Sequence, residues 1–233
     1  QLLEESLVFA KQDREYFRQY VQRCFMLDQD ARLIATATKH LADPEVAEEI
    51  RADLRLAAAQ AHFLRGDFAD AATLIKEHRL DRTADGYLLN CQLLWESGDR
   101  TGALAEVDAA LALFPAGVRL LEMKARWLKE SGEFARAKDT LDLLAISQPG
   151  RPGPLIQSLY LLPGEEGRVR REALTEKIIA TFGNQEQPML DLARFGNDTS
   201  DVALTARLAR LALERKFGNR VRFDLVHVEC LLN

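Results

Sequence analysis

A three-residue pattern recurs three times in this chain at almost constant spacing. The copies are Gly66-Asp67-Phe68, Gly98-Asp99-Arg100 and Gly132-Glu133-Phe134. Their glycines lie 32 and 34 residues apart, and an alanine follows each glycine five positions later. Self-similarity with a period near 34 residues indicates an array of helical hairpins, in which each hairpin buries its apolar face only against its neighbours.

The residues around each turn have the periodicity of amphipathic helices. In the third copy, Leu121 and Leu128 precede Gly132 at helical spacing, and Leu141 and Leu144 follow it. A glycine suits the left-handed conformation just past a helix end. Ala and Leu are abundant, whereas β-branched residues are sparse. The sequence therefore predicts an all-α protein.

These positions resemble the tetratricopeptide repeat (TPR). That family has a small residue midway along the first helix, a Gly-Asp/Asn-aromatic turn, a small residue early in the second helix and a closing proline. The matching residues here are Ala59, Cys91 and Ala125 in the first helices, Ala71, Ala103 and Ala137 in the second helices, and Pro115 and Pro149 at the ends. The resemblance covers residues 52–150. It departs from the family where His62, Leu94 and Leu128 replace a large aromatic residue.

The resemblance implies an α-α superhelix, a TPR-like solenoid of helical hairpins with additional C-terminal helices. We expect N-terminal helices that cap the array in residues 1–51, three repeats in residues 52–150, and a helical extension in residues 151–233. The last boundary follows from the segment 149–154, whose three prolines stop any helix. Residues 221–225 alternate like a strand, so the tail is either a final helix or a strand-like end. A helix is favoured because a lone strand has no sheet to join.

Apolar periodicity predicts helices on both flanks of the repeats, with Asp28 or Asp30 and Asp43 as candidate N-caps. The predicted segments are Leu2–Met26, Ala31–Leu41, Pro44–Leu64, Leu155–Leu162, Val169–Phe182, Pro188–Phe195 and Ser200–Phe217.

Charge and cysteine content exclude several classes of protein. The net charge is −5, and neither half is basic enough for nucleic acid or an anionic membrane; the cluster Arg168, Arg170 and Arg171 is interpreted as a solvated helix face. No apolar run reaches membrane-spanning length. Cys24, Cys91 and Cys230 are odd in number and lack C-x-x-C spacing, which predicts free core thiols. This favours a cytoplasmic location, while a start at Gln1 rather than Met favours a processed product or a fragment.

No phosphate-binding, dinucleotide, zinc-protease or hydrolase motif is present, so the sequence predicts no catalytic residue and no cofactor. His62 and His78 lie on the two helices of one hairpin, where a metal pair is an alternative to packing histidines. His227, Glu229 and Cys230 crowd together near the end without a second cluster. Packing roles are preferred for both groups, and no metal site is predicted.

The resemblance also implies a binding groove, because in this family the first helices line a concave surface that holds peptides. The lining positions would be Asp53, Leu56, Gln60, Asp85, Leu88, Gln92, Trp95, Arg119, Glu122, Arg126 and Lys129. The Lys and Asn with which some relatives clamp a terminal carboxylate are missing from the first two units, so that activity is not carried over. The positions run from acidic to basic and suit an extended segment with an apolar middle and an acidic end.

The leading hypothesis is a non-catalytic scaffold that binds a protein or peptide partner in this groove. One alternative is a helical regulatory or targeting domain of a larger enzyme or of secretion or polysaccharide machinery. A second alternative is a homo-oligomerisation module that uses the C-terminal helices.

Overall fold

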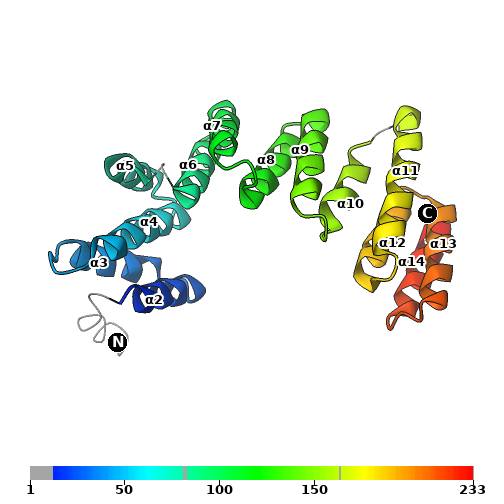
Figure 1. Ribbon diagram of the computed structural model, residues 1–233, viewed down its shortest axis with the longest axis horizontal. Helices are drawn as coiled ribbons and strands as arrows, with labels where there is room; N and C mark the ends of the chain where they lie inside the picture. The colour runs from blue at the N-terminus through cyan, green and yellow to red at the C-terminus, as the bar shows by residue number, and fades with distance from the viewer. Residues whose placement is uncertain (1–12, 81–82, 163, 233) are drawn as a thin grey trace. The chain divides into compact units, whose positions relative to one another are not determined.

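The computed structural model describes residues 13–80, 83–162 and 164–232, and its regular elements there are α-helices with no strand. In chain order, and labelled as in Figure 1, they are α2 (Arg14–Met26), α3 (Asp30–Leu41), α4 (Glu48–Leu64), α5 (Phe68–His78), α6 (Ala84–Glu96), α7 (Arg100–Leu113), α8 (Val118–Glu130), α9 (Phe134–Ser147), α10 (Gly153–Tyr160), α11 (Gly164–Phe182), α12 (Glu186–Asp198), α13 (Val202–Glu214) and α14 (Arg220–Leu232). The expected all-α array of helical hairpins is confirmed.

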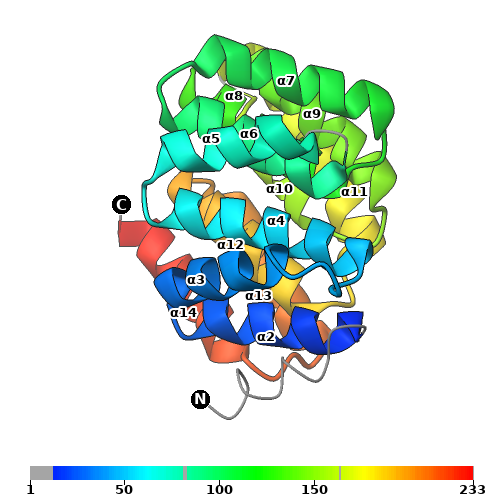
Figure 2. The same cartoon turned by 90° about the vertical axis from the view of Figure 1, so that its left-hand side faces the viewer.

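The chain divides into two compact units, residues 1–120 and 121–233. In the first unit, α3 packs on α4, α4 on α5, and α6 on α7. The helix α2 also contacts α4, and α4 contacts α6, so first helices of successive hairpins are neighbours. Figure 2 shows α2, α3 and α4 lying alongside one another. Leu33 and Leu54, both fully buried, belong to the core that joins these three helices.

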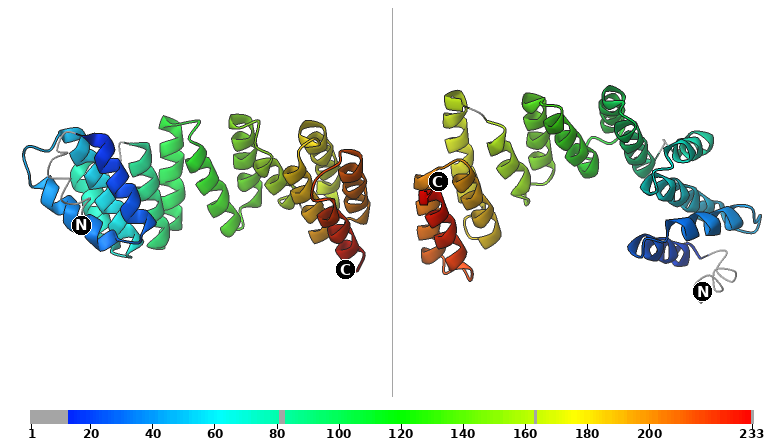
Figure 3. Two further views of the ribbon diagram at one scale, coloured as in Figure 1. Left: turned by 90° about the horizontal axis from the view of Figure 1, so that it is seen from below. Right: turned by 180° about the vertical axis from the view of Figure 1, so that it is seen from behind.

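The second unit contains a continuous core built from α10 to α14. Its most deeply buried members include Leu159, Ile178, Met189, Leu208 and Phe223, which come from five different helices. Figure 3 shows α12, α13 and α14 packed together at the C-terminal end. Residues 220–232 form a helix, and Phe223 and Cys230 are its buried residues. The strand-like alternative for this part of the tail is therefore wrong.

The repeated glycines adopt the conformation that the sequence pattern predicts. Gly66, Gly98 and Gly132 have φ values of +82°, +91° and +76°. These values lie in the region where a Cβ is unfavourable. At the first turn the amide of Asp67 donates to the carbonyl of His62 at 2.9 Å, which is a helix-terminating bond of the Schellman type. The chain therefore reverses tightly enough to lay the second helix against the first.

The flanking helices begin at residues that the sequence placed differently. The helix α4 begins at Glu48, after Ala47, and the Asp43 carboxylate accepts from the amide of Glu45 instead of capping a helix. Asp28 has a φ of +50° and occupies the turn between α2 and α3, while Gln29 is the residue before α3. Asp30 is already the first residue of α3, so the prediction of Asp28 or Asp30, and of Asp43, as N-caps is wrong. The part of the first expected helix that precedes residue 13 lies outside the described residues.

The hairpin pattern reappears in the second unit at Ser200, outside the three repeats that the sequence predicts. Ser200 has a φ of +54°, and it lies 68 residues after Gly132, which is twice 34. The next residue, Asp201, caps α13 by accepting from the amide of Leu204 at 2.9 Å. A buried small residue, Ala193, lies seven positions before Ser200, as Ala59 does before Gly66. The helices α12 and α13 therefore repeat the residue pattern of the earlier hairpins, with serine in place of the turn glycine.

This hairpin reverses the sizes of two packing positions. In the three earlier units, the residue four before the turn glycine is large and the residue five after it is alanine. Here the two positions hold Gly196 and the buried Thr205. A Cβ on Gly196 would lie 3.0 Å from the Thr205 methyl carbon and 3.4 Å from a methyl of Leu204. Gly196 therefore provides the close approach that alanine provides elsewhere.

We predict that Gly196→Ala and Thr205→Ser are energetically coupled. Alone, the Gly196 change adds a methyl to a filled space and costs roughly 1–3 kcal/mol, partly offset by about 1 kcal/mol of helix propensity. Thr205→Ser removes the facing methyl and costs about 1 kcal/mol. In the double variant the new methyl occupies the vacated space. Its loss of unfolding free energy, measured by urea unfolding, should therefore be about 1 kcal/mol smaller than the sum of the two single losses. Additive single effects would contradict this packing assignment.

Candidate functional site

The predicted groove positions divide between the two compact units. Seven of them lie on α4 and α6, and Arg119 at the start of α8 also belongs to the first unit. Glu122, Arg126 and Lys129 lie on the part of α8 that belongs to the second unit. The structure therefore defines one candidate groove within the first unit, and the three remaining positions are described with the second.

A cavity of about 580 Å³ opens on the first unit along the first helices of its hairpins. Three predicted positions line it, namely Asp53, Asp85 and Arg119. The other lining residues are Phe17, Arg18, Val21, Gln22, Phe25 and Leu54. The cavity thus spans α2, α4, α6 and the first turn of α8. Volumes of this size accommodate a few side chains of a bound segment.

The apolar part of the cavity comes mainly from α2. Phe17, Val21 and Phe25 recur every four residues and so share one face of that helix. Phe17 is buried, whereas Val21 and Phe25 are half-buried and keep surface open to the cavity. The sequence pattern predicts this helix as part of the N-terminal cap and predicts no site residue on it. One sequence feature relates this helix to the first helices of the repeats. Asp28 occupies the turn position, and Val21 lies seven residues earlier, where the repeats place their mid-helix small residue.

An ion-pair network fixes the charged wall between α2 and α4. Arg14 donates two hydrogen bonds to the Asp53 carboxylate, at 2.7 and 2.8 Å, and Arg18 donates a third at 3.1 Å. The Asp53 side chain is 25% exposed. Its hydrogen bonds with Arg14, and secondarily Arg18, hold the pKa of Asp53 below its ordinary value. Asp53 therefore stays ionised and joins the two helices.

A second pair crosses from α6 to the start of α8. The Arg119 guanidinium lies 2.9 Å from the Asp85 carboxylate, and both side chains are more than half exposed. An exposed pair of this kind contributes at most about 1 kcal/mol to stability. It can therefore open when a bound segment offers a better partner to either residue.

The remaining first-unit positions differ in how much surface they offer. Gln60 is exposed, while Leu56, Gln92 and Trp95 are half-buried. The Arg100 guanidinium lies 5.1 Å from the centre of a Trp95 ring, a cation–π distance. Leu88 is only 7% exposed and forms part of the core. A ligand would gain little contact area from Leu88.

The second-unit positions are engaged with their own neighbours. Glu122 pairs with Arg151 at 3.0 Å, Arg126 lies 3.9 Å from Glu130, and Lys129 donates to Gln157 at 3.1 Å. Trp127 on the same helix is 1% exposed and therefore belongs to the core.

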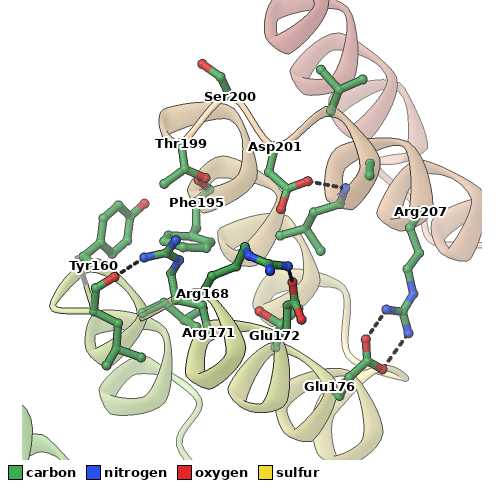
Figure 4. A pocket seen from close by; sticks show the side chains of 16 residues that line it. Tyr160, Arg168, Arg171, Glu172, Glu176, Phe195, Thr199, Ser200, Asp201 and Arg207 are labelled. Carbon is green, nitrogen blue, oxygen red and sulfur yellow. Dashed lines mark hydrogen bonds and ion pairs between the residues drawn. The ribbon is translucent and has the colours of Figure 1, made fainter. Parts of the chain in front are cut away.

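A larger cavity, of about 890 Å³, lies within the second unit between α10, α11 and the α12–α13 turn. Figure 4 shows Arg207 reaching from α13 to Glu176 on α11, and the two side chains form two hydrogen bonds. Arg168 pairs with Glu172 at 3.0 Å on the same helix. The Arg171 guanidinium donates to the backbone carbonyl of Leu162.

Arg168 and Arg170 are exposed, as expected for a solvated helix face, and Arg168 and the half-buried Arg171 also line this cavity. The Arg207 hydrogen bonds hold the pKa of Glu176 below its ordinary value. Tyr160 donates to Asp198 at 2.8 Å and stacks edge-on against Phe195 at 4.9 Å. The charged side chains of the cavity thus largely compensate one another and tie its walls together.

The cysteines do not form a reactive site. Cys24, Cys91 and Cys230 are buried and are not joined in disulfides. Burial raises the pKa of Cys91 to about 12, so its sulfur stays a protonated thiol at neutral pH. His227, which the sequence groups with Glu229 and Cys230, shares a 3.0 Å hydrogen bond with the hydroxyl of Thr205. None of the helices in the described residues is both long and apolar enough to cross a bilayer.

Comparison with protein-family models gives no match, and comparison with curated protein sequences gives none either. Solved structures do match. One is the structure of PilF from Pseudomonas aeruginosa, from its functional characterization. It matches with a TM-score of 0.58 and 17% sequence identity, and the match covers 93% of this chain and 97% of that chain. At this identity the likeness shows the fold alone, a TPR-like superhelix of helical hairpins.

We predict that the Asp53 network stabilises the first unit at neutral pH and fails in acid. The pKa of Asp53 is lower in the folded chain than in the unfolded chain. The network's contribution to the free energy of unfolding is therefore complete above the ordinary aspartate pKa near 4, and it is lost as the pH falls through the lowered pKa of the folded chain. Asp53→Asn should cost about 1 kcal/mol at pH 7, a value typical of a well-formed charged network. Urea unfolding at pH 7 and near pH 2 checks this, since the two proteins should become equally stable in acid. A constant difference would contradict it.

Proposed function

We propose that this chain is a non-catalytic scaffold that binds a segment of a protein partner in the first-unit groove. The observation that carries the proposal is the cavity along α2, α4 and α6, which is walled by half-buried Val21 and Phe25. Successive first helices of a hairpin array form the surface that such folds use for peptides. The match in fold to a TPR-like protein supports the same interpretation.

The chemistry of the groove favours a segment that inserts apolar side chains between charged edges. Asp53, held by its network, and the Asp85–Arg119 pair both line the cavity. An amphipathic helix or an extended strand would place one or two apolar residues over Phe25 and its polar residues at these edges. Arg119, released from Asp85, would pair with an acidic residue at the end of the segment.

We predict that a bulky residue at the groove mouth blocks binding without unfolding the chain. Gln22 is exposed and lines the cavity, so Gln22→Trp places an indole over the opening. Peptides selected from a random displayed library with the unmodified chain should bind this variant at least about tenfold more weakly, a loss of about 1.4 kcal/mol. Fluorescence anisotropy of labelled peptides measures the affinity.

The matched control is Gln187→Trp, which adds the same indole to an exposed glutamine on α12. It should bind the selected peptides as the unmodified chain does. Equal affinity of both variants would place the peptide site elsewhere, and a library that yields no binder would contradict the scaffold proposal itself.

A second candidate function, self-association, rests on one face of α14. Val221, Leu225, Val228 and Leu232 are 67%, 56%, 50% and 82% exposed. Their 4-3-4 spacing places them in one apolar stripe, as in the a and d positions of a coiled coil. The occupant that fits this stripe best is the same stripe of a second copy, because two-fold pairing lets identical apolar residues cover one another.

We predict that charges in this stripe abolish self-association. Leu225→Glu with Val228→Glu should give the monomer mass in multi-angle light scattering at concentrations where the unmodified chain gives a dimer. Arg210→Glu on an exposed position of α13 changes charge elsewhere and should leave the dimer intact. A monomeric unmodified chain would refute this second function and leave the groove proposal untouched.

A further inference from the structure

The turn between α4 and α5 brings together three side chains of metal-binding type. His62 comes from the last turn of α4, Asp67 precedes α5, and Asp70 lies in the first turn of α5. The ligand atoms of these three residues all lie within 4.8 Å of one another. His78, the alternative partner of His62 in the sequence, is exposed and lies outside this group.

The imidazole of His62 carries an unsatisfied nitrogen in this group. Its Nδ1 atom is buried and has no hydrogen-bond partner. The nearest Asp67 and Asp70 carboxylate oxygens lie 3.5 and 3.8 Å away, beyond an ordinary hydrogen bond. A buried polar atom without a hydrogen-bond partner destabilises the folded chain. A bound group that contacts His62 Nδ1 would remove this cost.

The Asp67 side chain also does not cap the following helix, although it occupies the N-cap position. It precedes α5 but makes no hydrogen bond to the amides of that helix. At the equivalent position of the next hairpin, Asp99 caps α7 by accepting from the amide of Gly102 at 2.8 Å. Asp67 instead faces His62, and Arg65 approaches the same carboxylate at 3.1 Å. An N-cap bond worth about 1 kcal/mol has been given up for this orientation.

No other recognised turn has this set of residues. The positions of His62, Asp67 and Asp70 correspond to Leu94, Asp99 and Gly102 in the second hairpin. In the third hairpin they correspond to Leu128, Glu133 and Arg136. The histidine and the second aspartate are therefore departures from the repeat, and they occur together in one unit.

The distances from His62 Nδ1 to the two carboxylates are close to the ligand separations around a tetrahedral ion. Zinc binds imidazole nitrogen and carboxylate oxygen at about 2.0–2.2 Å, which places neighbouring ligands roughly 3.3–3.5 Å apart. The observed 3.5 and 3.8 Å need only small side-chain rotations to reach this spacing. Imidazole favours zinc and similar transition ions over magnesium or calcium.

We propose that His62, Asp67 and Asp70 form a site for a divalent transition-metal ion of the zinc type. The ion bonds to His62 Nδ1 and to one oxygen from each aspartate, and a fourth position stays open to water or to a ligand from a partner. Arg65, whose side chain is 45% exposed, turns toward solvent when the ion takes its place. The bound ion links the end of α4 to the beginning of α5 and so stabilises the first recognised hairpin.

The test is titration of the full chain with zinc chloride by isothermal calorimetry, together with thermal unfolding. The unmodified chain should bind one ion at this site and unfold at a higher temperature with zinc. Asp70→Asn should weaken binding at least about tenfold and remove the thermal shift. Asp70 is 70% exposed, so this change leaves the core intact. His62→Asn should have the same effect, with circular dichroism as the check on folding.

Two matched controls separate this site from general zinc binding. His78→Asn removes the exposed histidine of the same hairpin, and Asp99→Asn removes the equivalent turn aspartate; both should bind zinc as the unmodified chain does. Cobalt(II) should give the visible absorption of a tetrahedral site without a thiolate charge-transfer band. The proposal is overturned by absence of binding, by unchanged affinity in Asp70→Asn, by loss of binding in His78→Asn, or by a thiolate band.

Discussion

The close crossing of two helices beneath each turn is the constraint on which the rest of this structure depends. A helix can fold back along its predecessor only where the crossing lacks bulk, since helices pack at interaxial distances of 8–10 Å set by the side chains between them. Ala71, Ala103 and Ala137 satisfy this requirement and are fully buried. The hairpin at Ser200 satisfies it with Gly196 opposite Thr205. Regular crossings place the first helices of the first unit side by side, which is the arrangement that creates its groove.

The residues that enforce these crossings are also the ones that made the fold predictable. Gly66, Gly98 and Gly132 mark the turns because the backbone there needs a positive φ, which glycine adopts without strain. The same reasoning failed at Asp28 and Ser200, which adopt a positive φ with a side chain present. The requirement applied equally there, but the sequence met it with a residue that does not identify it. Spacing alone, at twice 34 residues, marked Ser200 as a turn.

Much less of the candidate site followed from the sequence, because a groove depends on which helices become neighbours. Asp53, Asp85 and Arg119 were expected from the resemblance to the repeat family, and all three line the first-unit cavity. The apolar wall from α2 was not expected, since its hairpin lacks the turn glycine. The grouping of His62 with Asp67 and Asp70 also escaped notice. It depends on side-chain orientation at a tight turn, which spacing does not specify.

The internal pairing of the charged residues decides what a partner can gain from the groove. Asp53 is held by two arginines, and Arg119 is held by Asp85. A partner's charge must displace one of these bonds, so it exchanges one ion pair for another and gains little net free energy. Apolar side chains placed against Val21 and Phe25 displace only water, and each contributes in proportion to the area it buries. The apolar middle of a bound segment should therefore supply most of its affinity, while its charged end sets its direction along the helices.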